Sequence, residues 1–212
     1  GDLFVTLEPC SHYGETPPCV NTIIKNKIKN VFFSIKDPDS RSFNKSTTIF
    51  KKKGIIARNG FCSKKINFFY RSYIKSRKGT LPFVTIKLAI SKDFFVKHKK
   101  KKWITNSFSR GRVHLMRSNH DCILTSSKTI INDNPRFTCR ISGLENKSPS
   151  LIVLDKNLNI SITSKIIRSA IDNHTIIFFN KINKKKIKAL KKFKVKLIKA
   201  SLLKNGNFDL RK

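Results

Sequence analysis

The chain is 212 residues long, which is enough for one large domain or two small ones. Hydrophobic residues make up 39% of it, so a packed core is expected and global disorder is excluded. No apolar run approaches the length of about 20 residues that a membrane helix needs, so no membrane partner is expected. The sequence opens at Gly1 without an initiating Met and passes directly into an apolar run, so we expect a fragment that lacks both ends of its parent protein.

The formal net charge is +34, from 46 Lys and Arg against 12 Asp and Glu. A basic surface can bind nucleic acid or anionic lipid. However, the residues of A/T-rich codons (Lys, Asn, Ile and Phe) are all abundant, and the basic residues are scattered along the chain. We therefore attribute the charge to codon bias and expect no specific nucleic-acid partner. The five Cys residues, an odd number at irregular spacing, favour a reducing cytoplasm over a disulfide framework.

The first part of the chain alternates strands and helices. Apolar and β-branched runs predict strands at residues 3–7, 31–35 and 55–57, and helical spacing predicts helices at 18–29 and 46–53. This order implies an α/β layer with parallel strands. A further helix begins at Ser63 and fades into residues 76–82, the best candidate for a domain boundary. We therefore predict two domains, at 1–78 and 79–212.

Two cysteines flank a loop rich in Pro, Gly and Ser between the first strand and the first helix. Cys10 follows Pro9 at the strand end, and Cys19 starts the helix after Pro18. Thiolates are good zinc ligands, and a helix N-terminus lowers the pKa of a thiol there. Zinc deaminases hold the metal with a His and two Cys, in a signature H-x-E…P-C-x-x-C whose Glu shuttles protons. Here eight residues separate the two Cys instead of two.

The string PCSHxGxTPPC, with this expanded loop, resembles the deaminase half of the bifunctional deaminase/reductase family of riboflavin biosynthesis. The resemblance implies that Cys10 and Cys19 are zinc ligands in a cytidine-deaminase-like fold. It also implies that the third ligand and the general-base Glu lie upstream of residue 1, because no H-x-E occurs in the chain. No catalytic residue is therefore assigned within the chain, and we expect it to lack deaminase activity by itself. Glu15 departs from the family, which carries Lys or Arg there.

Beyond the boundary the α/β pattern restarts. Strands are predicted at residues 83–90, 121–125, 151–155, 175–179 and 194–198, and helices at 107–118, 164–170 and 183–192. Residues 82–93 resemble the opening strand of the same family's reductase domain, which has a dihydrofolate-reductase-like fold. Residues 129–140, with Asp133 ahead of Asn134-Pro135, match a later segment of that domain closely. The predicted fold class is α/β, with the C-terminal part of a three-layer deaminase-like domain before the N-terminal part of a reductase domain.

The resemblance also implies the reductase site. The residues implied at the NADPH site are Ala89, Trp103, Thr129, Asp133 and Lys156, and those implied at the ribose-phosphate substrate are Lys101, Arg117, Phe137 (through its backbone) and Arg140. The residue types suit the task, because Arg binds phosphate bidentately and the cofactor carries the hydride chemistry. Phe94, which follows Asp93, departs from the family, which has Gly at that position. Lys101 and Lys156 stand where relatives use Ser.

The implied function is zinc-dependent hydrolytic deamination of 2,5-diamino-6-(5-phosphoribosylamino)pyrimidin-4-one, followed by NADPH-dependent reduction of 5-amino-6-(5-phosphoribosylamino)uracil to the ribitylamino product. One alternative is a reductase with a degenerate deaminase half. The other is a basic zinc module that binds nucleic acid without catalysis, which predicts steeply salt-dependent binding and no NADPH site. The expected partners are small phosphoribosylaminopyrimidines, and a homo-oligomer is left open.

Overall fold

The computed structural model describes residues 1–79, 81–96 and 103–210. Contacts between residues divide the chain into two compact units, Gly1–Lys87 and Leu88–Lys212. The boundary predicted between residues 78 and 79 stays a prediction. Among the helices of the described ranges, none has the length and apolar composition needed to cross a membrane.

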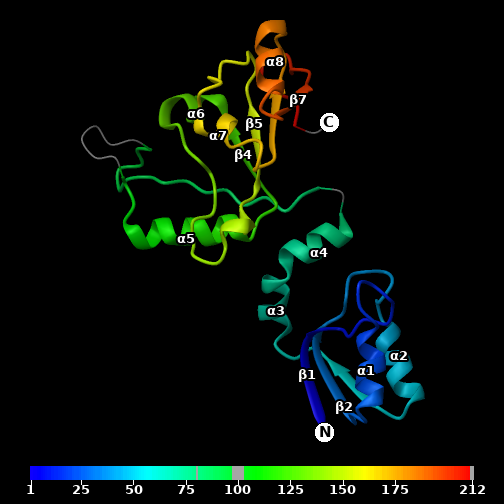
Figure 1. Ribbon diagram of the computed structural model, residues 1–212. Helices are drawn as coiled ribbons and strands as arrows, with labels where there is room; N and C mark the ends of the chain where they lie inside the picture. Colours follow the sequence, from blue (N-terminus) through cyan, green and yellow to red (C-terminus); the bar gives the residue numbers. More distant parts are fainter. Residues whose placement is uncertain (80, 97–102, 211–212) are drawn as a thin grey trace. The chain divides into compact units, whose positions relative to one another are not determined.

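The first unit is built on a parallel sheet of three strands. The strands are β1 (Asp2–Leu7), β2 (Asn30–Ile35) and β3 (Ile56–Asn59), in the order β1-β2-β3. The helices are α1 (Cys19–Lys25), α2 (Lys45–Lys52), α3 (Ser63–Phe69) and α4 (Arg71–Lys78). Helices α1 and α2 lie together beside the sheet (Figure 1) and share a small core around Val20, Val31 and Phe50.

Two helices of this unit differ from the sequence-based expectation. Helix α1 ends at Lys25 rather than near residue 29, because the chain turns at Lys27, whose φ of 52° is left-handed. The helix predicted from Ser63 onward forms as α3 and α4, which meet at Tyr70. The hydroxyl of Tyr70 lies 3.0 Å from that of Thr6 on β1, so the break lies where the chain contacts the sheet.

The second unit contains a parallel sheet of four strands. In spatial order they are β4 (Cys122–Ser126), β5 (Ser150–Leu154), β6 (Thr175–Phe179) and β7 (Lys196–Lys199). The helices are α5 (Ser107–Ser118), α6 (Ser127–Asp133), the 3₁₀ turn η1 (Glu145–Lys147), α7 (Lys165–Arg168) and α8 (Lys184–Lys191). A larger core joins the sheet to α6, α7 and α8, around Val153, Ile177, Ile166 and Leu190.

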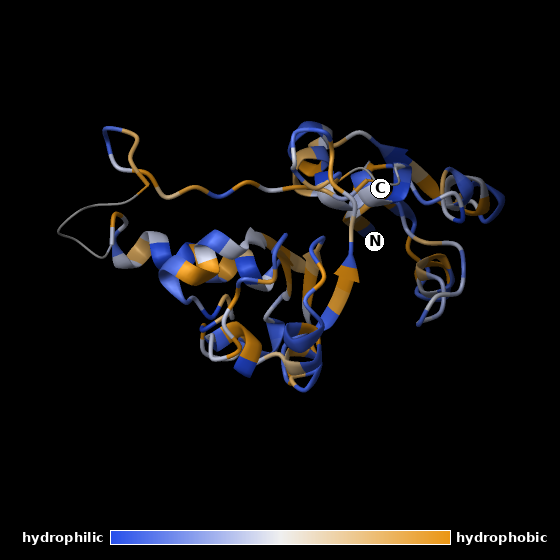
Figure 2. Ribbon diagram, turned by 90° about the horizontal axis from the view of Figure 1, so that it is seen from above, coloured by the Kyte–Doolittle hydropathy of each residue, from blue (hydrophilic) through white to orange (hydrophobic). Residues whose placement is uncertain are grey.

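The strand predicted at residues 83–90 is wrong for this structure. The segment is extended, but among the described residues it joins no ladder. Val84, Ile86 and Leu88 are exposed, and Figure 2 shows a long extended stretch with much hydrophobic colouring. The alternating pattern correctly predicts extended backbone, whereas a strand also requires a neighbour that accepts its hydrogen bonds.

Candidate functional site

The two predicted zinc ligands lie together at the carboxyl end of β1. The backbone N–H of Cys19, the first residue of α1, donates a hydrogen bond to Cys10 Sγ at 3.2 Å. The N–H of Val20 donates to the carbonyl of Cys10 at 3.2 Å, which closes the loop between the two thiols. Cys10 is half-buried and Cys19 is exposed. The two cysteines are therefore held next to each other, and the Cys19 side is accessible to solvent.

The pKa of Cys19 differs from the expectation. Partial burial of the sulfur, followed by the hydrogen bond and charge of Cys10, raises the pKa of the Cys19 thiol. A helix N-terminus was expected to lower it, but the neighbouring thiol and desolvation outweigh that effect in a short helix. Without a cation, the Cys19 thiol is therefore held in the neutral form.

A buried carboxylate holds the start of the cysteine loop. Glu8 is 2% exposed, and its Oε2 accepts hydrogen bonds from the backbone N–H groups of Asp37 at 3.3 Å and Asn44 at 3.2 Å. Its Oε1 accepts a hydrogen bond from Ser46 Oγ at 2.8 Å. Further along the loop, His12 Nδ1 lies 2.9 Å from Ser42 Oγ. The segment after β2 thus fixes the backbone on which Cys10 lies.

The metal shell is incomplete in the part of the chain that the structure describes. No group of three or more His, Cys, Asp or Glu side chains there could hold a metal ion. His12 contacts Ser42 through Nδ1 and belongs to no such group with the two thiols. Two thiols fill half of a tetrahedral zinc shell, so the zinc site and its third ligand stay predictions.

A charged cluster lies beside this loop. The Arg41 guanidinium donates to Asp39 from Nη2 at 2.7 Å and from Nε at 3.0 Å and 3.2 Å, and Arg77 lies 3.7 Å from the same carboxylate. Hydrogen bonds from Arg41 hold the pKa of Asp39 well below its ordinary value. Tyr73 donates a hydrogen bond to Asp37 at 2.8 Å. Burial, together with that bond, raises the pKa of Tyr73 to about 12. Glu15, the family departure, is exposed.

The second unit brings three of the predicted substrate residues together. Arg117, near the end of α5, donates from Nη1 to the carbonyl of Thr138 at 3.0 Å, and its guanidinium carbon lies 5.8 Å from the Phe137 ring centroid. The backbone N–H of Arg140 donates to His114 Nδ1, one turn earlier on α5, at 3.1 Å. The segment carrying Phe137 and Arg140 therefore lies against α5.

Two arginines without a carboxylate define the electrostatics here. Burial, followed by the charge of Arg140, lowers the pKa of Arg117, although its guanidinium stays charged. Within the described residues, no ion pair joins either guanidinium to a carboxylate. Phe137 has a φ of 58°, a strained value for a bulky residue. The two guanidinium groups, one on α5 and one on the segment that carries Phe137, form a site suited to an anion.

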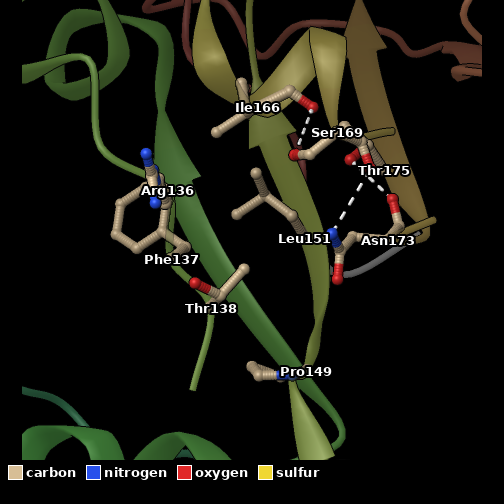
Figure 3. Close-up of a pocket in the computed structure, with 9 residues that line it drawn as sticks. All are labelled: Arg136, Phe137, Thr138, Pro149, Leu151, Ile166, Ser169, Asn173 and Thr175. Atoms are coloured by element: carbon tan, nitrogen blue, oxygen red, sulfur yellow. Dashed lines mark hydrogen bonds between the residues drawn. The ribbon is translucent and has the colours of Figure 1, made fainter. Parts of the chain in front are cut away.

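A small cavity lies behind this segment, between Phe137 and the sheet. Figure 3 shows its lining: Arg136, Phe137, Thr138, Pro149, Leu151, Ile166, Ser169, Asn173 and Thr175. Its volume is about 10 Å³, which is space for a single water. It is therefore a packing gap and not a substrate pocket.

The residues expected at NADPH lie in several places within the second unit. Thr129 and Asp133 are four residues apart on α6, which starts directly after β4, and Lys156 follows β5. Because β4 and β5 are parallel neighbours, Thr129 and Lys156 lie toward the same carboxyl edge, where α/β proteins bind ligands. An ammonium, a hydroxyl and a carboxylate suit the phosphates, hydroxyls and amide of a dinucleotide.

The remaining predicted residues are not gathered with these. Trp103 is 57% exposed, with the Arg110 guanidinium 5.0 Å from its ring centroid. Ala89 is half-buried in the extended segment, and Lys101 lies outside the described residues. Lys156 donates to the carbonyl of Gly206 at 3.2 Å.

Sequence reasoning missed Glu8 and His114, although His114 stands at helical spacing from Arg117.

The comparisons with known proteins bear on both units. Residues 82–210 match the family described as the RibD C-terminal domain. The chain belongs to this family. It is 35% identical over 168 residues to the riboflavin biosynthesis protein RibD of Bacillus amyloliquefaciens, covering 78% of this chain and 45% of that one. Its match to RibD of Aquifex aeolicus is 32% identical over 210 residues, covering 97% of this chain and 56% of the relative.

Solved RibD structures share the fold. Acinetobacter baumannii RibD superposes with a TM-score of 0.75 at 26% identity, over 94% of this chain and 56% of that chain. A Thermotoga maritima deaminase/reductase matches with a TM-score of 0.71 at 25% identity, over 93% and 61%. The predicted family and fold class are thus confirmed. The chain spans about half the length of the curated RibD relatives that it matches.

One departure from the RibD pattern has a structural consequence. Phe94, which replaces the expected Gly, has a φ of 65° and is 80% exposed. Only Gly adopts this region without steric cost, which for other residues is roughly 1–2 kcal/mol. The backbone at Phe94 therefore adopts a conformation that Gly favours and that a bulky side chain makes unfavourable.

Proposed function

We propose that the second unit binds the ribose-phosphate end of 5-amino-6-(5-phosphoribosylamino)uracil for reduction with NADPH in riboflavin biosynthesis. The observation that carries this proposal is the proximity of the Arg117 and Arg140 charges beside the backbone of Phe137 and Thr138, with no described ion pair to a carboxylate. Guanidinium groups bind phosphate oxygens through paired charge-assisted hydrogen bonds. The Thermotoga maritima relative is named as a reductase of this substrate.

The cofactor part of the proposal rests on Thr129, Asp133 and Lys156 toward the carboxyl edge of β4 and β5. NADPH, when bound, supplies the hydride, so the protein needs no nucleophile of its own. The Lys156 ammonium would hold a phosphate, and the Thr129 hydroxyl and Asp133 carboxylate would orient hydroxyl or amide groups. Trp103 and Ala89 complete the proposed set, with Lys101 on the substrate side.

A second proposed function, hydrolytic deamination, rests on the adjacent thiols of Cys10 and Cys19. These residues would hold two positions of a zinc ion, whose bound water is the nucleophile in deaminases. The proposal assigns the base for this water to the Glu of a His-x-Glu segment, a motif that the printed sequence does not contain. Reduction alone remains the alternative if that Glu is absent.

The reductase proposal is tested by NADPH oxidation with 5-amino-6-(5-phosphoribosylamino)uracil in the full-length protein. Arg140→Ala should raise KM by about 10- to 150-fold, the value of a charge-assisted hydrogen bond. Arg168→Ala is the matched control, because Arg168 is exposed on α7 of the same unit. No turnover by folded protein, or equal KM values in both variants, would reject the proposal and favour the basic nucleic-acid module.

A further inference from the structure

His114 lies between the two arginines of the proposed phosphate subsite and has no role in the chemistry described so far. It stands one turn before Arg117 on α5, and its imidazole faces the backbone of Arg140. We infer that His114 is a positioning residue: its neutral imidazole holds the Arg140 backbone so that both guanidinium groups face the same anion. This inference rests on the proposed function, because it takes the anion to be the substrate phosphate.

The hydrogen bonds around His114 assign its acceptor atom. The N–H of Arg140 approaches Nδ1 at 3.1 Å, and Arg117 Nη1 lies 3.4 Å from the same nitrogen. Both neighbours are donors, so Nδ1 must carry a lone pair and the proton must be on Nε2. The thiol of Cys139 also donates to the backbone carbonyl of His114 at 3.5 Å. Two successive residues of the 136–140 segment are therefore held against one turn of α5.

The surrounding charges keep the imidazole neutral. The groups that face it are Arg117 on its own helix and Arg140, the Cys139 thiol and the Thr138 carbonyl on the neighbouring segment. Burial, followed by the charges of Arg117 and Arg140, lowers the pKa of His114, and only the Thr138 carbonyl opposes this shift. Arg110, four residues earlier on α5, is engaged elsewhere, with the Trp103 ring.

Protonation would convert the acceptor into a donor. A protonated Nδ1 would carry an N–H directed at the N–H of Arg140, and the imidazolium would be a third cation beside two guanidinium groups. The contact with Arg140 should therefore be present above the pKa of His114 and lost below it. The pKa is lowered in the folded chain, so the neutral, positioning form predominates at neutral pH.

Two substitutions separate the acceptor role from simple filling of space. His114→Asn keeps an oxygen acceptor at the δ1 position but does not titrate, whereas His114→Leu removes the acceptor. His174→Asn is the control, because His174 is an exposed residue of the same unit that follows α7. All variants use the full chain, with folding checked by circular dichroism.

The first measurement follows the Arg140 amide in ¹H–¹⁵N spectra as the pH falls from about 7.5 to 5, a range that spans the ordinary His pKa of about 6.5. We expect the amide to shift together with the His114 ring in the parent chain and in His174→Asn, but not in His114→Asn. An Arg140 amide that does not respond when the His114 ring titrates would overturn the inference. This measurement needs no ligand, and it decides the inference even if His114→Leu does not fold.

The second measurement titrates inorganic phosphate at pH 7.5 and constant ionic strength, monitored at the side-chain N–H groups of Arg117 and Arg140. The parent and His114→Asn should bind equally, and His114→Leu about three- to ten-fold more weakly, the effect of one hydrogen bond. Equal binding by His114→Leu would reject the positioning role and leave the subsite intact. Phosphate that shifts neither arginine in the parent would instead reject the subsite.

Discussion

The Glu8 carboxylate and the Ser46 hydroxyl lie 2.8 Å apart and join the end of β1 to the first turn of α2. The other oxygen of Glu8 accepts two backbone N–H groups from the segment between β2 and α2. One buried side chain therefore connects three elements of the first unit, directly beside Cys10. The geometry of the cysteine loop depends on this carboxylate.

Glu8→Ala should destabilise the first unit by roughly 1–3 kcal/mol, because it leaves the N–H of Asp37 and the hydroxyl of Ser46 buried without an acceptor. Hydrogen exchange at the amides of Asp37 and Asn44 should be faster by the corresponding factor. Glu15→Ala removes an exposed carboxylate from the same loop and should change exchange little. Equal exchange rates in the two variants would contradict the assigned role.

The Asp39–Arg41 pair should make the unfolding free energy of the first unit depend on pH. The folded-state pKa of Asp39 is depressed, so its contribution is present above the unfolded pKa of about 3.9 and is lost as pH falls through the folded value. The difference in unfolding free energy between the parent and Asp39→Asn should therefore shrink below about pH 4. Chemical denaturation across that range measures it, and a difference independent of pH would refute the pairing.

Zinc binding by the chain should be weak and should increase with pH. Zinc binds the thiolate, and the raised pKa of Cys19 means that a proton must be displaced at neutral pH. Competition with a chromophoric chelator between about pH 6 and 9, a range around the ordinary Cys pKa of about 8.5, should show this increase. Cys19→Ser should abolish zinc binding. Cys62→Ser, which removes another exposed thiol of the same unit, should leave zinc binding unchanged.

Asp133→Ala should weaken NADPH binding by roughly ten-fold or more, the value of a charge-assisted hydrogen bond. The residue ends α6 and is exposed, so its removal should leave the core and the circular dichroism spectrum intact. Fluorescence of bound NADPH in the full-length protein measures the affinity. Asp172→Ala, at another exposed position of the unit, should bind as the parent does.

The sequence predicts most of the elements, and its failures have identifiable causes. Residues 31–35 and 83–90 are both apolar, extended runs, yet only the first becomes a strand, since pairing depends on partners that a local pattern does not contain. Helix α6 was not predicted, because Thr129, Ile130 and Ile131 are β-branched and favour strands. Burial of Ile130 in the core stabilises the helix despite this preference.

The candidate site is predictable to a similar extent. The resemblance predicted Arg117 and Arg140 as site residues. Their proximity depends on how α5 packs against a segment more than twenty residues later. The resemblance could not predict the role of His114, because the partner of its imidazole is a backbone N–H. Every residue except Pro has such a group, so the sequence does not identify the partner. Which amide lies opposite a given ring is decided by packing.

The unequal size of the two cores has a thermodynamic consequence. The buried cluster of the first unit is small and rests on Val20, Ile23, Val31 and Phe50, whereas that of the second is several times larger. Because apolar burial is the main favourable term in folding, the units should melt at different temperatures. A calorimetric scan should then give two overlapping transitions, and the van't Hoff enthalpy should fall below the calorimetric one. No single melting temperature would describe this chain.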